Sequence, residues 1–134
     1  MLYGIGCDLC QVSRIQKSLA GKHGAAFAAR VFGPQERQAL GLGEEPAELS
    51  AHRAASAAAD FAAKEAFLKA AGTGLSGFAL AEIQAVRLPS GAPEYRFAGA
   101  AARWMEQNGL KAHLSLCHEQ GLAMAYCILE QGGV

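Results

Sequence analysis

Two carboxylates stand in apolar surroundings, one at the end of a predicted strand and one on the helix face that we expect to be buried. Asp8 ends an apolar segment, residues 2–9, and Glu65 shares one side of a predicted helix with Phe61 and Leu68. A bare carboxylate on such a face is costly or takes up a proton unless it meets a cation, a metal or a hydrogen-bond donor. Magnesium takes one or two carboxylates and completes its shell with water and the phosphates of a substrate. The pair therefore predicts a metal site of the kind that serves nucleotides.

Each of these residues also has a purely structural interpretation. Asp8 could cap the turn that follows its strand, and Glu65 could form an i,i+4 ion pair with Lys69. Lys64 precedes Glu65 and is rotated about 100° from it on the helix, so its ammonium could reach a phosphate on the same metal. The structural alternative for Lys64 is an i,i+4 pair with Asp60.

A glycine-rich segment and two strand histidines are weaker candidates. The segment GTGLSG, residues 72–77, follows a predicted helix and lacks a G-K-[ST] ending, so it is not a P-loop. Gly72 and Gly74 indicate either a flexible loop or a close approach of the backbone to a ligand. His113 and His118 occupy opposite faces of a predicted strand, where a lone histidine is more often structural than catalytic.

A zinc site is a further possibility, built on the C-x-x-C spacing of Cys7 and Cys10. These two residues could join Cys117 and His118 as a ligand set. No helix opens at this C-x-x-C, and neighbours on a strand point to opposite faces. We therefore favour reduced cysteines that act as small buried hydrophobic residues.

Hydrophobic periodicity and the breaks at glycine and proline predict the elements that hold these residues. In chain order they are a strand at 2–9, a helix capped by Ser13, a short helical turn at 34–40, a long alanine-rich helix at 49–71, hairpin strands at 83–88 and 95–97, a helix at 98–108, and strands at 111–118 and 122–130. The order β-α-α-ββ-α-ββ contains hairpins in place of a regular strand–helix alternation. It predicts the α+β class, with a mainly antiparallel sheet packed by helices.

The first predicted helix is amphipathic with a basic outer face. Its apolar side carries Val12, Ile15 and Leu19. No acidic residue occurs between Asp8 and Glu36, whereas that stretch holds the basic residues Arg14, Lys17, Lys22 and Arg30. An acidic partner could dock on this segment.

Length and composition exclude several function classes. The 134 residues fit one domain, 1–134, and 12 basic residues cancel 12 acidic ones, which argues against a nucleic-acid binder. No stretch approaches the ~20 apolar residues of a membrane span and the N-terminus lacks a secretory pattern, so we expect a soluble, cytoplasmic protein. Alanine inflates the hydrophobic share of 51% and only 7% of residues are aromatic, so the core of a monomer would be thin and oligomerisation would thicken it.

Five segments together resemble the short, stand-alone phosphopantetheinyl transferase family, the holo-acyl-carrier-protein synthases. They are GIGCDL at 4–9, RI at 14–15, RVF at 30–32 with Glu36, FAAKEA at 61–66 with KAAGTG at 69–74, and HLSLCHE at 113–119. The family patterns that they resemble include G-I-G-x-D-[IL], F-A-A-K-E-A and H-x-S-[IL]-[TS]-H. The segments occur in the expected order over nearly the whole chain.

The resemblance implies an enzyme that moves the 4′-phosphopantetheine group of coenzyme A onto a serine of an apo acyl carrier protein, as fatty acid biosynthesis requires. In such an enzyme Asp8 and Glu65 would bind magnesium, which bridges the pyrophosphate of coenzyme A. Lys64 would stabilise the phosphate that is attacked, and His118 would position coenzyme A or the reacting groups.

The resemblance also implies how the chain meets its substrates and its own copies. Gly72 and Gly74 would approach coenzyme A, and Arg14, with Lys17 and Lys22, would meet the acidic recognition helix of the carrier protein. The family is trimeric with active sites between subunits, which agrees with the thin core.

Two positions depart from the family pattern. Gln11 stands where the family usually has an acidic residue, and Asp60 stands where it usually has arginine. If that arginine contacts coenzyme A in relatives, the contact here would come from elsewhere, for example from Arg53. These departures keep a second hypothesis open, a non-catalytic module that binds coenzyme A or a carrier protein.

Overall fold

The computed structural model describes residues 1–74 and 77–132, so Leu75 and Ser76 of the glycine-rich segment lie outside the described residues. The strands are β1 (Leu2–Gln11), β2 (Ile83–Arg87), β3 (Pro93–Phe97), β4 (Leu110–Glu119) and β5 (Leu122–Gln131). The helices are α1 (Val12–Ala20), α2 (Gly24–Val31), α3 (Pro34–Leu40), α4 (Ala51–Ala71) and α5 (Gly99–Gln107), and a 3-10 turn, Leu80–Glu82, precedes β2.

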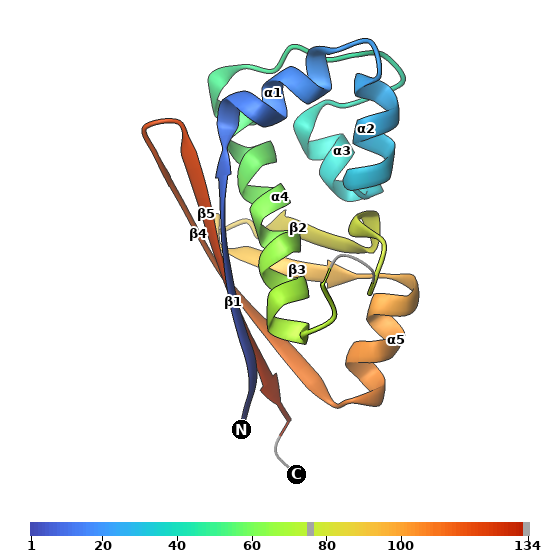
Figure 1. Cartoon of the computed structure of the whole chain (residues 1–134), viewed down its shortest axis with the longest axis vertical. Coiled ribbons are helices and arrows are strands. Elements are labelled where there is room, and N and C mark those ends of the chain that lie inside the picture. The colour runs from blue at the N-terminus through green and yellow to red at the C-terminus, as the bar shows by residue number, and fades with distance from the viewer. Residues whose placement is uncertain (75–76, 133–134) are drawn as a thin grey trace.

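The predicted α+β class and the antiparallel pairing are confirmed, but the strands divide into two sheets. A three-stranded sheet has the order β1-β5-β4, and β2 pairs with β3 in a separate hairpin. Figure 1 shows α4 lying along the three-stranded sheet, with α1, α2 and α3 gathered around one end of that helix and α5 near the other end. The long helix therefore packs against all three strands of the larger sheet, against β2, and against α1 and α3.

The predicted limits of the long helix are nearly correct. The helix begins at Ala51, two residues after the predicted start, because Ser50 is the N-cap and its Oγ accepts a hydrogen bond from the backbone N–H of Arg53 (3.2 Å). It ends at Gly72, whose φ of 77° is the left-handed conformation that favours glycine after a helix. The cap and the glycine are both readable from sequence.

Small residues let β1 lie unusually close to α4. A Cβ added at Gly4 would overlap the carbonyl oxygen of Ala70, and one added at Gly6 would overlap that of Ala66. Because the two backbones approach this closely, the C-terminal half of β1, which carries Asp8, runs directly beside the helix.

The N-terminal half contains one helix more than the sequence predicted. Helix α2 has no side-chain cap and no acidic residue in its first turn, so packing of its buried side holds it and its local signal is weak. Helix α1 begins at Val12, and Gln11 occupies the N-cap position without a side-chain cap hydrogen bond. The prediction of Ser13 as the cap was wrong, because Ser13 lies inside the first turn of the helix; the N–H of Val12 donates to the carbonyl of Gly121 in the β4–β5 turn (2.9 Å).

A small aromatic cluster joins the β2–β3 hairpin and α5 to the long helix. Phe67 of α4 lies 4.8 Å from Phe97, 5.9 Å from Tyr95 and 6.1 Å from Trp104 between ring centroids. The hydroxyl of Tyr95 donates a hydrogen bond to the backbone carbonyl of Ala63 (2.6 Å). Few large side chains thus carry this side of the core, and alanine fills most of the rest.

The three-stranded sheet leaves its other face uncovered in the single chain. Alternate residues of β5, among them Ala123, Ala125 and Cys127, are buried on the side of α4. The opposite side, which we call the outer sheet face, carries exposed apolar side chains at Ile5, Leu9, Leu122, Met124 and Tyr126. Among the described residues no helix is both long and apolar enough to cross a lipid bilayer.

Candidate active site

The structure brings the strand-end aspartate and the long-helix glutamate together. Asp8 lies on the same face of β1 as Gly6 and Cys10, which are buried against α4. The pKa of the Glu65 carboxyl is raised, first by its burial and second by the negative charge of Asp8. Two carboxylates that repel each other in a half-buried place form a site that a cation would stabilise.

Two basic side chains border this carboxylate pair. Lys69 Nζ donates to Asp8 Oδ1 (3.3 Å) and to the carbonyl oxygen of Cys7 (2.9 Å), so the ion pair of this lysine is with Asp8 and the predicted i,i+4 pair with Glu65 does not form. The Arg14 guanidinium lies over the Phe61 ring, 6.0 Å from its centroid. Lys69 and Arg14 both lower the pKa of Glu65, against the larger effects of burial and Asp8.

The carboxylate pair matches the oxygen ligands that magnesium prefers in proteins. Asp8 and Glu65 supply two hard oxygen donors and leave the rest of an octahedral shell to water and substrate phosphates. Across residues 1–74 and 77–132, no three side chains of His, Cys, Asp or Glu gather as a metal-ligand set. The zinc set built on the C-x-x-C spacing is therefore not formed there; Cys7 is exposed and Cys10 is buried on the other side of β1.

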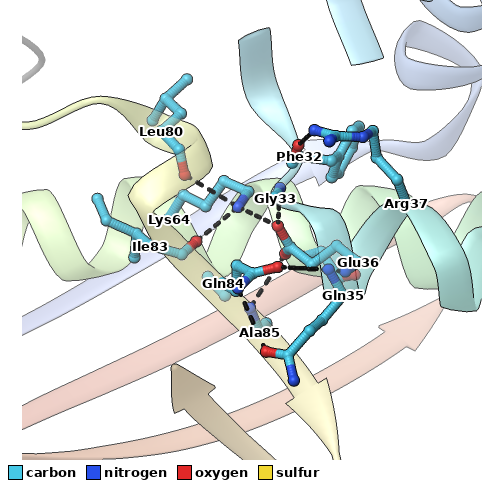
Figure 2. Close-up of polar contacts among 12 residues, drawn as sticks. Phe32, Gly33, Gln35, Glu36, Arg37, Lys64, Leu80, Ile83, Gln84 and Ala85 are labelled. Atoms are coloured by element: carbon cyan, nitrogen blue, oxygen red, sulfur yellow. Dashed lines mark hydrogen bonds and ion pairs between the residues drawn. The ribbon is translucent and has the colours of Figure 1, made fainter. Parts of the chain in front are cut away.

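Lys64 does not line this site. Its side chain is fully buried, and its Nζ lies 2.5 Å from Glu36 Oε1 and donates to the carbonyl oxygens of Ile83 (2.5 Å) and Leu80 (3.1 Å), as Figure 2 shows. These three acceptors occupy the three N–H donors of the ammonium. The structure therefore corrects both interpretations of Lys64, as a ligand of the attacked phosphate and as a partner of Asp60. Burial lowers the pKa of Lys64, and the neighbouring Glu36 works against that shift.

Glu36 is the centre of a buried polar cluster that sequence reasoning missed. It accepts hydrogen bonds from the backbone N–H of Gly33 (2.9 Å) and of Ala85 (3.0 Å) in addition to Lys64 (Figure 2). The side chain of Gln84 binds the backbone at the start of α3. A glutamate three residues into a helix that starts after a break was a usable signal for the first of these bonds. The pairing with a lysine 28 positions away was not readable from local pattern.

Asp60, the departure from the family pattern, has a cation of its own. It is 3% exposed and pairs with Arg87 of β2, whose Nη1 lies 2.8 Å from Oδ1. Burial raises the pKa of Asp60 to about 7, and the Arg87 guanidinium acts against that rise. Arg87, His52 and Arg53 line a cleft of about 430 Å³ between α4, α3 and β2.

His118 lies at a different cleft from the carboxylate pair. It is exposed on β4 and borders a cleft of about 230 Å³ whose lining also includes His52 and Arg87 but neither member of the carboxylate pair. His113 is exposed on the same strand and its Nε2 lies 3.1 Å from Glu130 Oε1. A single chain therefore does not place His118 beside the two candidate metal ligands.

The remaining predicted site residues are two glycines at the end of α4 and two lysines on or just after α1. Gly72 and Gly74 follow the end of α4, with φ of 77° and 66°, and a Cβ at either would meet no atom of the described residues. Lys17 is exposed on α1, as Arg14 is, and Lys22 is exposed just after the helix ends. Their roles in binding coenzyme A and a carrier protein stay predictions.

Comparison with known proteins points to one family. Residues 4–127 match the family described as the 4′-phosphopantetheinyl transferase superfamily. The chain is 40% identical over 132 residues to a holo-[acyl-carrier-protein] synthase of Aromatoleum aromaticum, covering 98% of this chain and 99% of that relative. It is 37% identical over 131 residues to a protein of the same name from Methylibium petroleiphilum, with 97% of each chain covered.

Solved structures show the same similarity in three dimensions. The crystal structure of holo-[acyl-carrier-protein] synthase from Neisseria meningitidis has a TM-score of 0.79 and 33% identity, covering 97% of this chain and 99% of that chain. The enzyme of the same name from Bacillus anthracis, in complex with CoA (3′,5′-ADP), has a TM-score of 0.77 and 28% identity, with 98% and 99% covered.

Proposed function

The chain belongs to the 4′-phosphopantetheinyl transferase superfamily, and from this membership we propose that it is a holo-acyl-carrier-protein synthase. It transfers the 4′-phosphopantetheine group of coenzyme A to a serine of an apo acyl carrier protein and releases 3′,5′-ADP. The observation that carries the proposal is the convergence of Asp8 and Glu65 beside Lys69 in a relative of enzymes with this name.

The carboxylate pair would hold a magnesium ion. When bound, magnesium supplies charge neutralisation at the phosphoryl oxygens and the leaving group. The raised pKa of Glu65 agrees with this assignment, because burial and the nearby charge of Asp8 disfavour its ionised form and a bound cation would offset both effects. The match of two rigidly held oxygen donors to magnesium chemistry supports it as well.

Lys69, in place of Lys64, is the lysine that we assign to the phosphates. Its ammonium is held beside Asp8 and the side chain is 57% exposed, so it can contact a ligand at the carboxylate pair. In the reaction the serine hydroxyl loses its proton to water, its oxygen forms a bond to the β-phosphorus of coenzyme A, and the bond from that phosphorus to the bridging oxygen breaks. The leaving 3′,5′-ADP gains negative charge, and Lys69 is placed to stabilise it.

The active sites lie between subunits of a homotrimer. The outer sheet face supports assembly, since it exposes between 37% and 59% of the surface of its five apolar side chains in the single chain. The separation of His118 from the carboxylate pair supports a shared site, because a neighbouring subunit could bring its His118 to Asp8 and Glu65.

The basic face of α1 is where the carrier protein docks. Arg14, Lys17 and Lys22 are exposed, and Arg14 also borders the carboxylate pair. An acidic helix that binds there would deliver its serine to the edge of the site. The reaction belongs in the cytoplasm, and the four free cysteines agree with a reducing compartment.

A transfer assay tests the function. Purified protein with magnesium, coenzyme A and an apo acyl carrier protein should yield a carrier heavier by one phosphopantetheine group in mass spectrometry. Asp8→Asn and Glu65→Gln should abolish that gain. An unchanged carrier mass, with a known transferase active under the same conditions, rejects the proposal; coenzyme A binding in that case would favour a non-catalytic module.

A further inference from the structure

The outer edge of β2 has no strand beside it among the described residues, since β2 pairs only with β3. The N–H of Ala98 donates to the carbonyl oxygen of Glu82 (2.9 Å), and this antiparallel pattern directs the N–H and C=O of the next residue, Ile83, away from β3. Ala85 lies two residues further along and points its backbone groups to the same outer edge. Ile83 and Ala85 are both buried, so these groups need partners from elsewhere in the fold.

Glu36 and Lys64 bind this outer edge in the way that a neighbouring strand would. Lys64 Nζ donates to the carbonyl oxygen of Ile83 (2.5 Å), and Glu36 Oε2 accepts from the N–H of Ala85 (3.0 Å), as Figure 2 shows. Both charged side chains are fully buried, and they pair with each other through Glu36 Oε1. The pair therefore supplies the donor and the acceptor that allow the edge of β2 to pack against α3 and α4.

Lys64 also holds the turn that leads into β2. Its Nζ donates to the carbonyl oxygen of Leu80 (3.1 Å), which begins the 3-10 turn Leu80–Glu82. This turn ends the connection from α4 to β2, and Gly72 and Gly74 stand at the start of that connection. One buried ammonium thus fixes where the connection returns to the core.

In the proposed function, on which this inference rests, Gly72 and Gly74 approach coenzyme A. We infer that Lys64 and Glu36 are positioning residues, which hold the connection after α4 in the arrangement that binds coenzyme A while neither side chain contacts the substrate. Without the ammonium, the buried carbonyl of Ile83 loses its donor, so the turn opens locally more often. The apparent affinity falls with the fraction of chains in the binding-competent arrangement, whereas a chain that has bound coenzyme A reacts at its ordinary rate.

The double variant Glu36→Gln, Lys64→Met tests the inference, because it removes both charges and the ammonium donor together. We expect KM for coenzyme A to rise roughly 10-fold, while kcat at saturating coenzyme A and KM for the carrier protein change by less than about twofold. Tyr95→Phe is the matched control, since the Tyr95 hydroxyl also donates to a buried backbone carbonyl, that of Ala63, without contacting the edge of β2. An unchanged KM for coenzyme A in the double variant, or an equal rise in the control, overturns the inference.

A milder double variant guards against a failure to fold. Glu36→Gln, Lys64→Gln keeps an amide N–H near the carbonyl of Ile83, so its KM for coenzyme A should lie between that of the wild type and that of the methionine variant. It carries the test alone if the methionine variant does not fold, and a KM equal to that of the wild type then overturns the inference.

Hydrogen–deuterium exchange measures the same turn without substrate. In the double variants the backbone amides of residues 77–85 should exchange roughly 10-fold faster than in the wild type, while those of β1 and β5 keep their protection. An equal rise over the whole chain would mean that the pair acts only on global stability, which overturns the inference. If the wild type modifies no carrier, calorimetry with coenzyme A replaces KM: a roughly 10-fold higher Kd in the double variant supports positioning, and equal Kd values or no binding overturn it.

Discussion

At the scale of single residues, the candidate active site depends on a lysine that a carboxylate holds in place. Lys69→Met removes the cation beside Asp8, and we expect kcat/KM for transfer to fall roughly 100-fold, as when one preorganised electrostatic donor is lost. The free energy of unfolding should hardly change, because the lysine is largely exposed and such ion pairs contribute little to stability.

Transfer rates from mass spectrometry and denaturant titrations measure the two effects of Lys69→Met separately. Lys111→Met is the control, since Lys111 is an exposed lysine on β4. Full activity in Lys69→Met, or an equal loss in Lys111→Met, would show that Lys69 has no specific role in the reaction.

The buried carboxyl of Asp60 should make stability depend on pH. Its pKa is about 7 in the folded chain, above its ordinary value of 3.8, mainly through burial and despite the charge of Arg87; Glu36 raises this pKa further and Lys64 lowers it. A raised pKa means that the folded state binds the proton more tightly. The resulting stabilisation is complete below about pH 4 and is lost as the pH rises to about 7, a change on the order of a few kcal/mol in the free energy of unfolding.

The Asp60→Asn variant isolates this contribution. Urea titrations at about pH 5 and about pH 7.5 should show a larger fall in the free energy of unfolding for the wild type than for Asp60→Asn, because the amide does not titrate. Parallel profiles would show that Asp60 keeps the same charge in both states.

The site was only partly predictable at this scale, for a geometric reason. An apolar strand and a helical stripe indicated Asp8 and Glu65 as carboxylates in apolar surroundings that need a cation, a metal or a hydrogen-bond donor. Lys64 and Lys69 both lie near Glu65 in sequence, and helical spacing alone does not show which of the two lysine side chains is buried. That choice is made by Glu36, 28 positions earlier, which offers Lys64 a buried anion.

At the scale of elements, the Glu36–Lys64 pair fastens α3 and α4 to β2. Glu36→Gln leaves the Lys64 ammonium buried without a carboxylate, and the free energy of unfolding should fall by roughly 3–5 kcal/mol. The double variant Glu36→Gln, Lys64→Met removes the charge as well and should regain much of that loss. Denaturant titrations measure both variants.

The activity of that double variant tests the assignment of Lys64. Since the ammonium donates to Glu36 and two backbone carbonyls, the folded double variant should still transfer phosphopantetheine. A double variant that folds but has no activity would show that Lys64 takes part in the transfer reaction.

Elements with a strong local signal were predictable, and those held by packing were not. Ser50 and Gly72 mark the limits of α4, and the hairpin turns lie where glycine and proline predicted them. Helix α2 has neither a side-chain cap nor a first-turn acid, so sequence alone gave no reason to start a helix at Gly24. The separate β2–β3 hairpin packs on α4 through contacts of Phe67 with distant rings, which no local period encodes.

At the scale of the whole molecule, the chain in isolation looks incomplete in two ways that one assembly would resolve. The outer sheet face, with Leu9 and Tyr126 among its side chains, exposes apolar surface that the single chain does not bury. His118 lies at a cleft that the carboxylate pair does not line. A trimer that buries the outer sheet face and joins the cleft of one subunit to the carboxylates of the next would satisfy both.

Shared sites predict that two inactive variants can restore each other. Asp8→Asn and His118→Ala should each have little activity as pure assemblies. In mixed assemblies, made by coexpression with two tags and tandem purification, a His118→Ala subunit can offer its intact Asp8 to the intact His118 of an Asp8→Asn subunit, so activity should return. The matched control mixes Asp8→Asn with Glu65→Gln, whose altered residues belong to the same half of the site; there no junction has both carboxylates, and activity should stay absent. Recovery in neither mixture would mean that each subunit works alone, since only a site built from two chains can be repaired by exchanging them.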